Sequence, residues 1–219
     1  MRRIFALVLF LVLGCSSGNV QTRHSTDLEA RKIRRIAVLP VGSMTSEQSP
    51  KGPAIPGSTP DGPAPQREMS EVLARLLYST MASMPNWQIV SEAEVREVAQ
   101  AARAPSEAVG LKQIGERVYA DAVITGKILR VRERIGDEWG VKSPASVAFV
   151  LDLVDVRRGD VIWSARYDET QKSLSENLLA IGDIGQRGVR WLKAEQLMHE
   201  GVKKAVAQLH DILVRPHTS

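Results

Sequence analysis

Apolar and polar positions alternate along the chain in patterns that predict separate strands and helices. Residues 36–41 form a continuous apolar run of strand length, which favours a strand covered on both faces. After Arg67, apolar residues recur every three or four positions down one helical face, until Pro85 and Asn86 end the pattern. This helical face is made of Met69, Val72, Leu73, Leu76, Leu77, Thr80, Met81 and Met84.

The middle of the chain predicts two more helices between two strands. Residues 87–90 form a short strand, and we expect Trp87, which opens it, to lie in the core. Ser91 with Glu94 forms a capping box that opens the next helix. A further helix begins after Pro105 and leads directly into a strand that starts at Ala122 and reaches about Arg132.

Strict alternation then predicts a β-hairpin between residues 147 and 167. Val147, Phe149, Leu151 and Leu153 share one face of the first strand, and residues 158–160 turn the chain. Val161, Trp163, Ala165 and Tyr167 alternate on the second strand, so we expect the aromatic residues of this hairpin to lie in the core.

The chain ends in a long amphipathic helix, for which Ser173 and Glu176 form a second capping box. The order of elements is therefore β-α-β-α-α-β-β-β-α. It predicts an α/β (α+β) fold, a single domain with a mixed sheet, because one crossover is parallel and the last three strands form an antiparallel meander.

Residues 1–15 follow neither the strand pattern nor the amphipathic-helix pattern of the rest of the chain. Arg2 and Arg3 precede the apolar run 4–13, which ends at Gly14 and Cys15. Ten residues of helix span about half of a roughly 30 Å hydrocarbon core, so a secretory signal is favoured over a membrane-spanning helix. Residues 12–15 (Val-Leu-Gly-Cys) resemble the lipobox of bacterial lipoproteins, which implies cleavage before Cys15 and acylation of its thiol. The alternative is an ordinary secretory signal with an incidental cysteine.

These boundaries divide the chain into a signal peptide (1–14), the lipidated cysteine with a flexible tether (15–32), a globular domain (33–214) and a tail (215–219). A Pro-rich loop, 42–66, interrupts the domain. Loss of Arg2 and Arg3 with the signal peptide leaves 27 basic and 25 acidic side chains, a net charge of +2. So small an excess gives no reason to expect nucleic-acid binding.

Three stretches of the domain resemble a group of bacterial envelope proteins. They are residues 35–41 (Arg-Ile-Ala-Val-Leu-Pro-Val), 120–127 (Ala-Asp-Ala-Val-Ile-Thr-Gly-Lys) and 150–163, which ends in Arg-Gly-Asp-Val-Ile-Trp. The group comprises the curli-secretion lipoproteins, the lipoproteins that activate penicillin-binding proteins, and the amino-terminal domain of the TolB translocation protein. The resemblance implies a fold more than a function. It also implies that Ser16, rather than an aspartate, directs the protein to the outer membrane, facing the periplasm.

Candidate chemistry is sparse along the chain. The four histidines lie at 24, 199, 210 and 217, and His199 and His210 are three helical turns apart, so we interpret them as solvated helix residues. We expect no catalytic residue, no bound metal and no cofactor, since no phosphate-binding loop or nucleophile motif is present.

The candidate partner-binding residues are aromatic or acidic side chains outside the apolar patterns. Trp139 lies in a glycine-bounded polar loop beside Asp137 and Glu138, and Trp191 precedes the last helix among basic residues. Folding of the Trp139 loop back onto the domain is the alternative.

The sequence therefore predicts a non-catalytic lipoprotein, held on the membrane by acylated Cys15. It is expected to bind an envelope protein in the assembly or regulation of a secretion or cell-wall machine. A homo-oligomeric export ring and an unrecognised envelope hydrolase are the alternatives.

Overall fold

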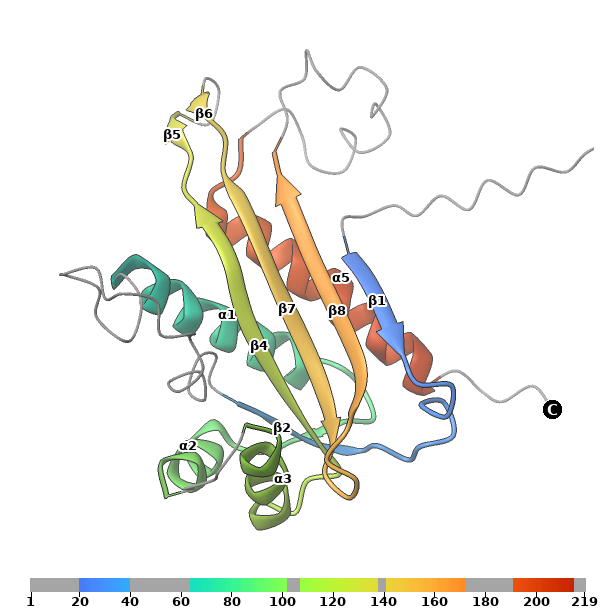
Figure 1. Ribbon diagram of the computed structural model, residues 1–219. Coiled ribbons are helices and arrows are strands. Elements are labelled where there is room, and N and C mark those ends of the chain that lie inside the picture. The colour runs from blue at the N-terminus through green and yellow to red at the C-terminus, as the bar shows by residue number, and fades with distance from the viewer. Residues whose placement is uncertain (1–19, 40–63, 102–106, 138–140, 172–190, 215–219) are drawn as a thin grey trace, which may run out of the picture.

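A mixed six-stranded sheet forms the centre of the computed structural model, which describes residues 20–39, 64–101, 107–137, 141–171 and 191–214. The strand order is β1-β8-β7-β4-β2-β3, in which β2 is parallel to both of its neighbours and the other pairs are antiparallel. The strands are β1 (Val20–His24), β2 (Arg35–Val38), β3 (Gln88–Ile89), β4 (Ala122–Arg132), β7 (Ser146–Asp155) and β8 (Val161–Thr170). A small second sheet pairs β5 (Ile135–Gly136) with β6 (Val141–Ser143) beyond the ends of β4 and β7 (Figure 1).

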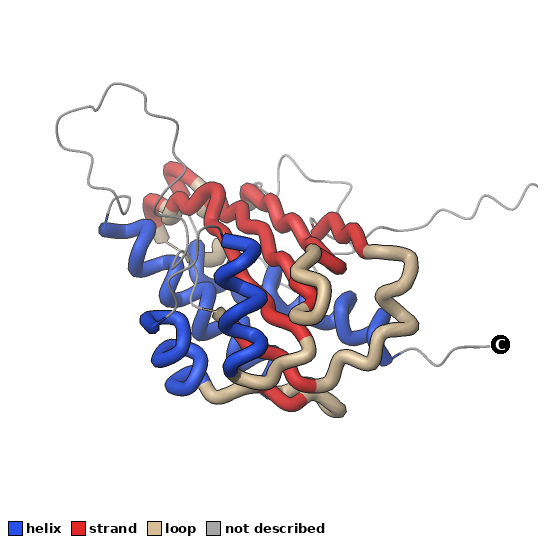
Figure 2. Tube along the Cα trace, turned by 60° about the horizontal axis from the view of Figure 1, so that its bottom comes forward, coloured by secondary structure: helices blue, strands red, loops and turns tan. Residues whose placement is uncertain are grey.

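In the part of the chain that the structure describes, four helices cover the sheet on its two faces. The long helices α1 (Ala64–Ala82) and α5 (Ala194–Val214) pack side by side on one face, and α2 (Glu92–Ala101) and α3 (Glu107–Arg117) lie on the other face near β2 (Figures 1 and 2). This arrangement confirms the predicted α+β fold with a mixed sheet. Within the described ranges, no helix is both long and apolar enough to cross a membrane.

Strand β2 separates two hydrophobic cores. Its Ile36 and Val38 point into the larger core under α1 and α5, whereas Ala37 and Leu39 point into the smaller core under α2 and α3. All four side chains are buried, as expected for a continuous apolar run in a strand covered on both faces.

The predicted hairpin is formed by β7 and β8. Phe149, Trp163 and Tyr167 are fully or almost fully buried, which confirms their assignment to the core. Val161 is 55% exposed, so its predicted place on the buried face is wrong. The reason is a shift of pairing register between Leu153 and Val154, which inserts Ile162 and turns Val161 to the other face.

Residues 20–32 are part of the folded domain, so the predicted tether is wrong there. Strand β1 pairs with β8 along five residues, and Leu28, in the turn that follows, is fully buried. An edge strand needs little alternation of apolar and polar residues, because backbone hydrogen bonds to the neighbouring strand hold it in place. The polar sequence of β1 therefore gives no periodic pattern that would predict a strand.

The other differences are small. Helix α1 begins at Ala64, inside the predicted loop 42–66, and β5 and β6 were not predicted. The backbone N–H of Glu94 donates to Ser91 Oγ at 3.3 Å, as expected for the predicted helix cap. The signal peptide, Cys15, residues 40–63, the second capping box and the tail 215–219 lie outside the described residues.

Candidate functional site

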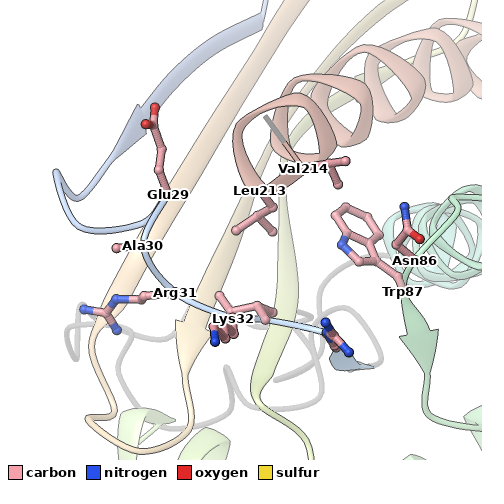
Figure 3. Close-up of a pocket in the computed structure, with 10 residues that line it drawn as sticks. Glu29, Ala30, Arg31, Lys32, Asn86, Trp87, Leu213 and Val214 are labelled. Atoms are coloured by element: carbon pink, nitrogen blue, oxygen red, sulfur yellow. The ribbon is translucent and has the colours of Figure 1, made fainter. Parts of the chain in front are cut away.

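A groove opens at the end of the sheet where β2 and β3 begin and α5 ends (Figure 3). It has a volume of about 330 Å³. Its walls come from three segments far apart in the sequence: the loop that leads into β2, the turn between α1 and β3, and the last residues of α5. The lining residues are Glu29, Ala30, Arg31, Lys32, Ile33, Arg34, Asn86, Trp87, Leu213 and Val214. We call it the Trp87 groove.

Trp87 is positioned by the turn before it and by a ring contact with His210. Asn86 adopts a left-handed backbone conformation (φ 69°), which turns the chain sharply between α1 and β3 and presents the indole. The ring meets the imidazole of His210 edge to face, with centroids 5.1 Å apart and an interplanar angle of 71°. A ring nitrogen of His210 in turn lies 3.1 Å from the carbonyl oxygen of Pro85.

These contacts correct two expectations. Trp87 is half-buried and lines the groove instead of lying wholly in the core, and His210 is half-buried against it instead of solvated. Figure 3 shows the indole nitrogen on the side of the ring that faces the groove. A half-buried tryptophan with a polar edge toward solvent is well suited to bind a partner, since it offers both apolar area and a hydrogen-bond donor.

The loop on the opposite wall is fixed by ion pairs. Arg31 bonds to Asp27 Oδ2 at 2.8 Å through Nη2 and to Asp155 Oδ2 through Nη1. Asp155 also accepts the backbone N–H groups of Arg157 and Arg158 at 2.8 and 3.0 Å. The loop is therefore fastened to the β7–β8 turn, so this wall of the groove is preformed.

Both carboxyl groups of this cluster have lowered pKa values. Burial acts to raise the pKa of Asp155, but the backbone N–H of Arg158 and the Arg31 guanidinium outweigh it and hold that pKa below its usual range. The hydrogen bond from Arg31 is the largest of the effects that lower the pKa of Asp27. Both acids are therefore charged at neutral pH, and their ion pairs with Arg31 are formed under physiological conditions.

The rim of the groove is basic and its floor apolar. Lys32 and Arg34 are exposed, and neither has an ion-pair partner among the residues described in the structure. Leu213 is half-buried and Val214 is 41% exposed, so the end of α5 adds aliphatic surface beside Trp87. Glu29 is the one acid in the lining. Such a surface can hold an apolar side chain and a neighbouring negative charge.

Two of the predicted partner-binding residues, Asp137 and Trp191, are described in the structure, and neither lines the Trp87 groove. Asp137 is exposed next to β5, and Trp191 is half-buried just before α5, where its carbonyl accepts a hydrogen bond from Arg134. Nothing in the structure tests a partner-binding role for Asp137 or Trp191, so both stay predictions. Trp139 and Glu138 lie outside the described residues. Strand β5, which Asp137 follows, lies at the opposite end of the sheet from the start of β2, where the groove opens (Figure 1).

The groove itself was not foreseen. Trp87 and His210 are 123 positions apart in the sequence, and only the packing of α5 beside the α1–β3 turn brings their rings together. Over the described ranges, no group of three or more histidine, cysteine or acidic side chains has a metal-binding arrangement.

Comparison with known proteins yields structural likenesses only. No family model matches the chain, and no curated protein does so. One similar solved structure is the PelC dodecamer of Paraburkholderia phytofirmans, with 15% identity and a TM-score of 0.47 over 88% of this chain and 98% of that one. LpoB of E. coli has 16% identity and a TM-score of 0.37, over 64% of this chain and 59% of that one.

The lipoprotein GNA1162 of Neisseria meningitidis has 18% identity and a TM-score of 0.38, over 70% of this chain and 96% of that one. Similar structures thus include members of the envelope-lipoprotein group that the sequence resembles.

Proposed function

We propose that the protein is a membrane-anchored lipoprotein of the bacterial cell envelope that acts without catalysis, by binding another envelope protein at the Trp87 groove. Its role would be in the assembly or regulation of a secretion or cell-wall machine. The observation that carries the proposal is the held, half-buried indole of Trp87, with a basic rim on one side and aliphatic residues on the other. Tryptophan and arginine are the residues most enriched among those that dominate protein interfaces.

The size of the groove supports a contact with part of a protein. At about 330 Å³ it lies at the small end of the range for ligand sites, so it holds one or two side chains of a partner. The preformed wall built by Arg31 lowers the entropic cost of binding, because the loop 29–34 is already ordered before a partner arrives.

Photocrosslinking in the producing cells tests the contact. With p-benzoylphenylalanine at position 32, on the groove rim, irradiation should give an adduct with another envelope protein. The matched control is position 127 on β4, where an exposed lysine lies away from the groove. Equal adducts at both positions, or none at position 32, would contradict the proposal. An adduct with a second copy of this chain would favour the export-ring alternative.

The membrane anchor is tested by Cys15→Ser. Cys15 is the sole cysteine of the chain, at the end of the apolar run 4–13, and no thiol other than its own is available for acylation. We expect the variant either to stay uncleaved or to leave the membrane fraction, since stable anchoring needs more than one acyl chain, as a triacylated cysteine supplies. Mass spectrometry of the mature amino terminus provides the readout. An unmodified amino terminus at another residue would end the lipoprotein assignment, and outer-membrane fractionation checks the expectation drawn from Ser16.

A further inference from the structure

A second aromatic residue lies at the same end of the sheet as the Trp87 groove. Tyr119 is 84% exposed and has a left-handed backbone conformation, φ 52°. It occupies the position just after α3 where the backbone reverses: Ala120 N–H donates to Gly115 O at 2.9 Å and Tyr119 N–H to Glu116 O at 3.2 Å. Glycine takes this position without steric strain, whereas a tyrosine does not. Neither burial nor backbone preference accounts for the side chain found there, whereas a contact with a partner would.

Hydrogen bonds place Tyr119 on the other side of Arg34 from Trp87. The backbone N–H of Gln88, next to Trp87, donates to Arg34 O at 2.7 Å. Asp121 Oδ2, two residues after Tyr119, accepts the backbone N–H groups of Arg34 and Arg35, both at 2.9 Å. Strands β3, β2 and β4 therefore begin next to one another, and with a strand spacing of about 4.8 Å the two aromatic positions are separated by about 10 Å.

Most of the exposed charged side chains around the two aromatics are basic. Lys32, Arg34 and Arg117 are exposed, and the described part of the chain gives none of them an ion-pair partner. Some nearby acids are occupied: Asp121 by the backbone bonds of Arg34 and Arg35, and Glu94 by Arg35 at 3.8 Å. Glu116 is 4.0 Å from Lys112. Glu29 in the groove lining is exposed and likewise has no ion-pair partner among the described residues. Positive charges nevertheless outnumber it: Lys32 and Arg34 lie at the groove, and Arg117 lies two residues before Tyr119.

We propose that this surface, from the Trp87 groove across Arg34 to Tyr119, binds a short extended acidic segment of the partner protein. The inference rests on the proposed function and names the chemistry of the partner. An extended chain rises about 3.3 Å per residue, so three or four residues bridge the two aromatics. An apolar side chain of that segment enters the groove, its carboxylates face Lys32, Arg34 and Arg117, and its far end packs on Tyr119.

The test places p-benzoylphenylalanine at position 119 of the full-length protein in its own cells and maps the crosslinked peptide by mass spectrometry. The expected product is an adduct with a segment of another protein rich in aspartate and glutamate. A neutral or basic segment, a second copy of this chain, nucleic acid, lipid alone or no adduct at position 119 overturns the inference. If position 32 gives an adduct and position 119 does not, the proposed function stands and this inference fails; if neither does, both fail.

Charge and side-chain variants then separate binding from folding, with the crosslinker at position 32. Arg34→Glu and Tyr119→Gly should each lower the adduct yield by about tenfold, and Arg34→Lys should largely retain it. Tyr119→Gly should not lower the melting temperature, because glycine relieves the left-handed strain, so loss of adduct cannot be a folding defect. The control Leu129→Ser changes an exposed apolar residue on β4 and should leave the yield unchanged. Equal yields with Arg34→Glu and Arg34→Lys, or an unchanged yield with Tyr119→Gly, count against the inference.

Discussion

Trp163→Ala is expected to lower the free energy of unfolding by about 3–5 kcal/mol, as for other truncations of large core side chains. Trp163 is 1% exposed and lies in the larger core, on β8 between Leu153 of β7 and His24 of β1. Three adjacent strands and α5 surround it, so the surroundings cannot collapse into the space that alanine leaves. Urea denaturation of the chain without its signal peptide, followed by circular dichroism, measures the loss.

Two controls identify the cause of that loss. Trp163→Phe keeps most of the ring volume and removes the indole N–H, which is buried with no hydrogen-bond acceptor among the described residues. It should therefore cost less than half of the alanine value. Trp191→Ala, at a half-buried position before α5, should also cost clearly less. A loss below about 1 kcal/mol for Trp163→Ala would show that the ring is not a core residue.

Gly201→Ala should destabilise the fold by about 1–3 kcal/mol, the usual cost of overpacking, although alanine normally favours a helix over glycine by about 1 kcal/mol. A Cβ at position 201 of α5 would lie 2.7–2.9 Å from Cδ1, Cγ and Cε1 of Tyr167. Tyr167 cannot move aside easily, because its hydroxyl donates to Glu169 Oε2 at 2.6 Å and its ring packs on Phe149 at 5.1 Å. A fall in the thermal midpoint is therefore expected.

The control for this effect is Lys203→Ala, at an exposed position two residues further along α5. It also introduces alanine into the helix but adds no atom against the sheet, so its midpoint should move by no more than an ordinary surface substitution does. If Gly201→Ala raised the midpoint as a simple gain of helix propensity would, the close approach of α5 to β8 would be wrong.

The elements that could be predicted are those whose side chains are sorted by burial. Strands β2, β7 and β8 and helix α1 bury one face or two, and burial leaves a periodic pattern of apolar residues. Strand β1 escaped detection because Gln21, Arg23 and His24 face solvent and the strand is held by its backbone. Periodicity also could not register the single inserted residue, Ile162, that turns Val161 outward.

The candidate site had no local signature to find. The Trp87 groove is assembled from segments around residues 30, 87 and 213, and the interpretation of Trp87 as a core residue followed from its place beside an apolar strand. Tyr119 was not singled out, because a residue that ends a helix directly before a strand gives no sign of its backbone conformation. The sequence did draw attention to Trp139, in residues 138–140, which the structure does not describe.

Because strand β1 belongs to the folded domain, only a short stretch of chain separates the domain from Cys15. Had the chain been free from Cys15 to Ile33, it could have extended about 60 Å from its lipid, whereas the five steps from Cys15 to Val20 reach no further than about 18 Å. With the anchor proposed for Cys15, the domain stays close to its lipid and diffuses together with it along the bilayer. Strand β1 runs toward the end of the sheet that carries the groove (Figure 1), so the groove lies beyond the far end of β1 from Val20. The search for a partner then becomes two-dimensional, and a partner must come to that membrane or be resident in it.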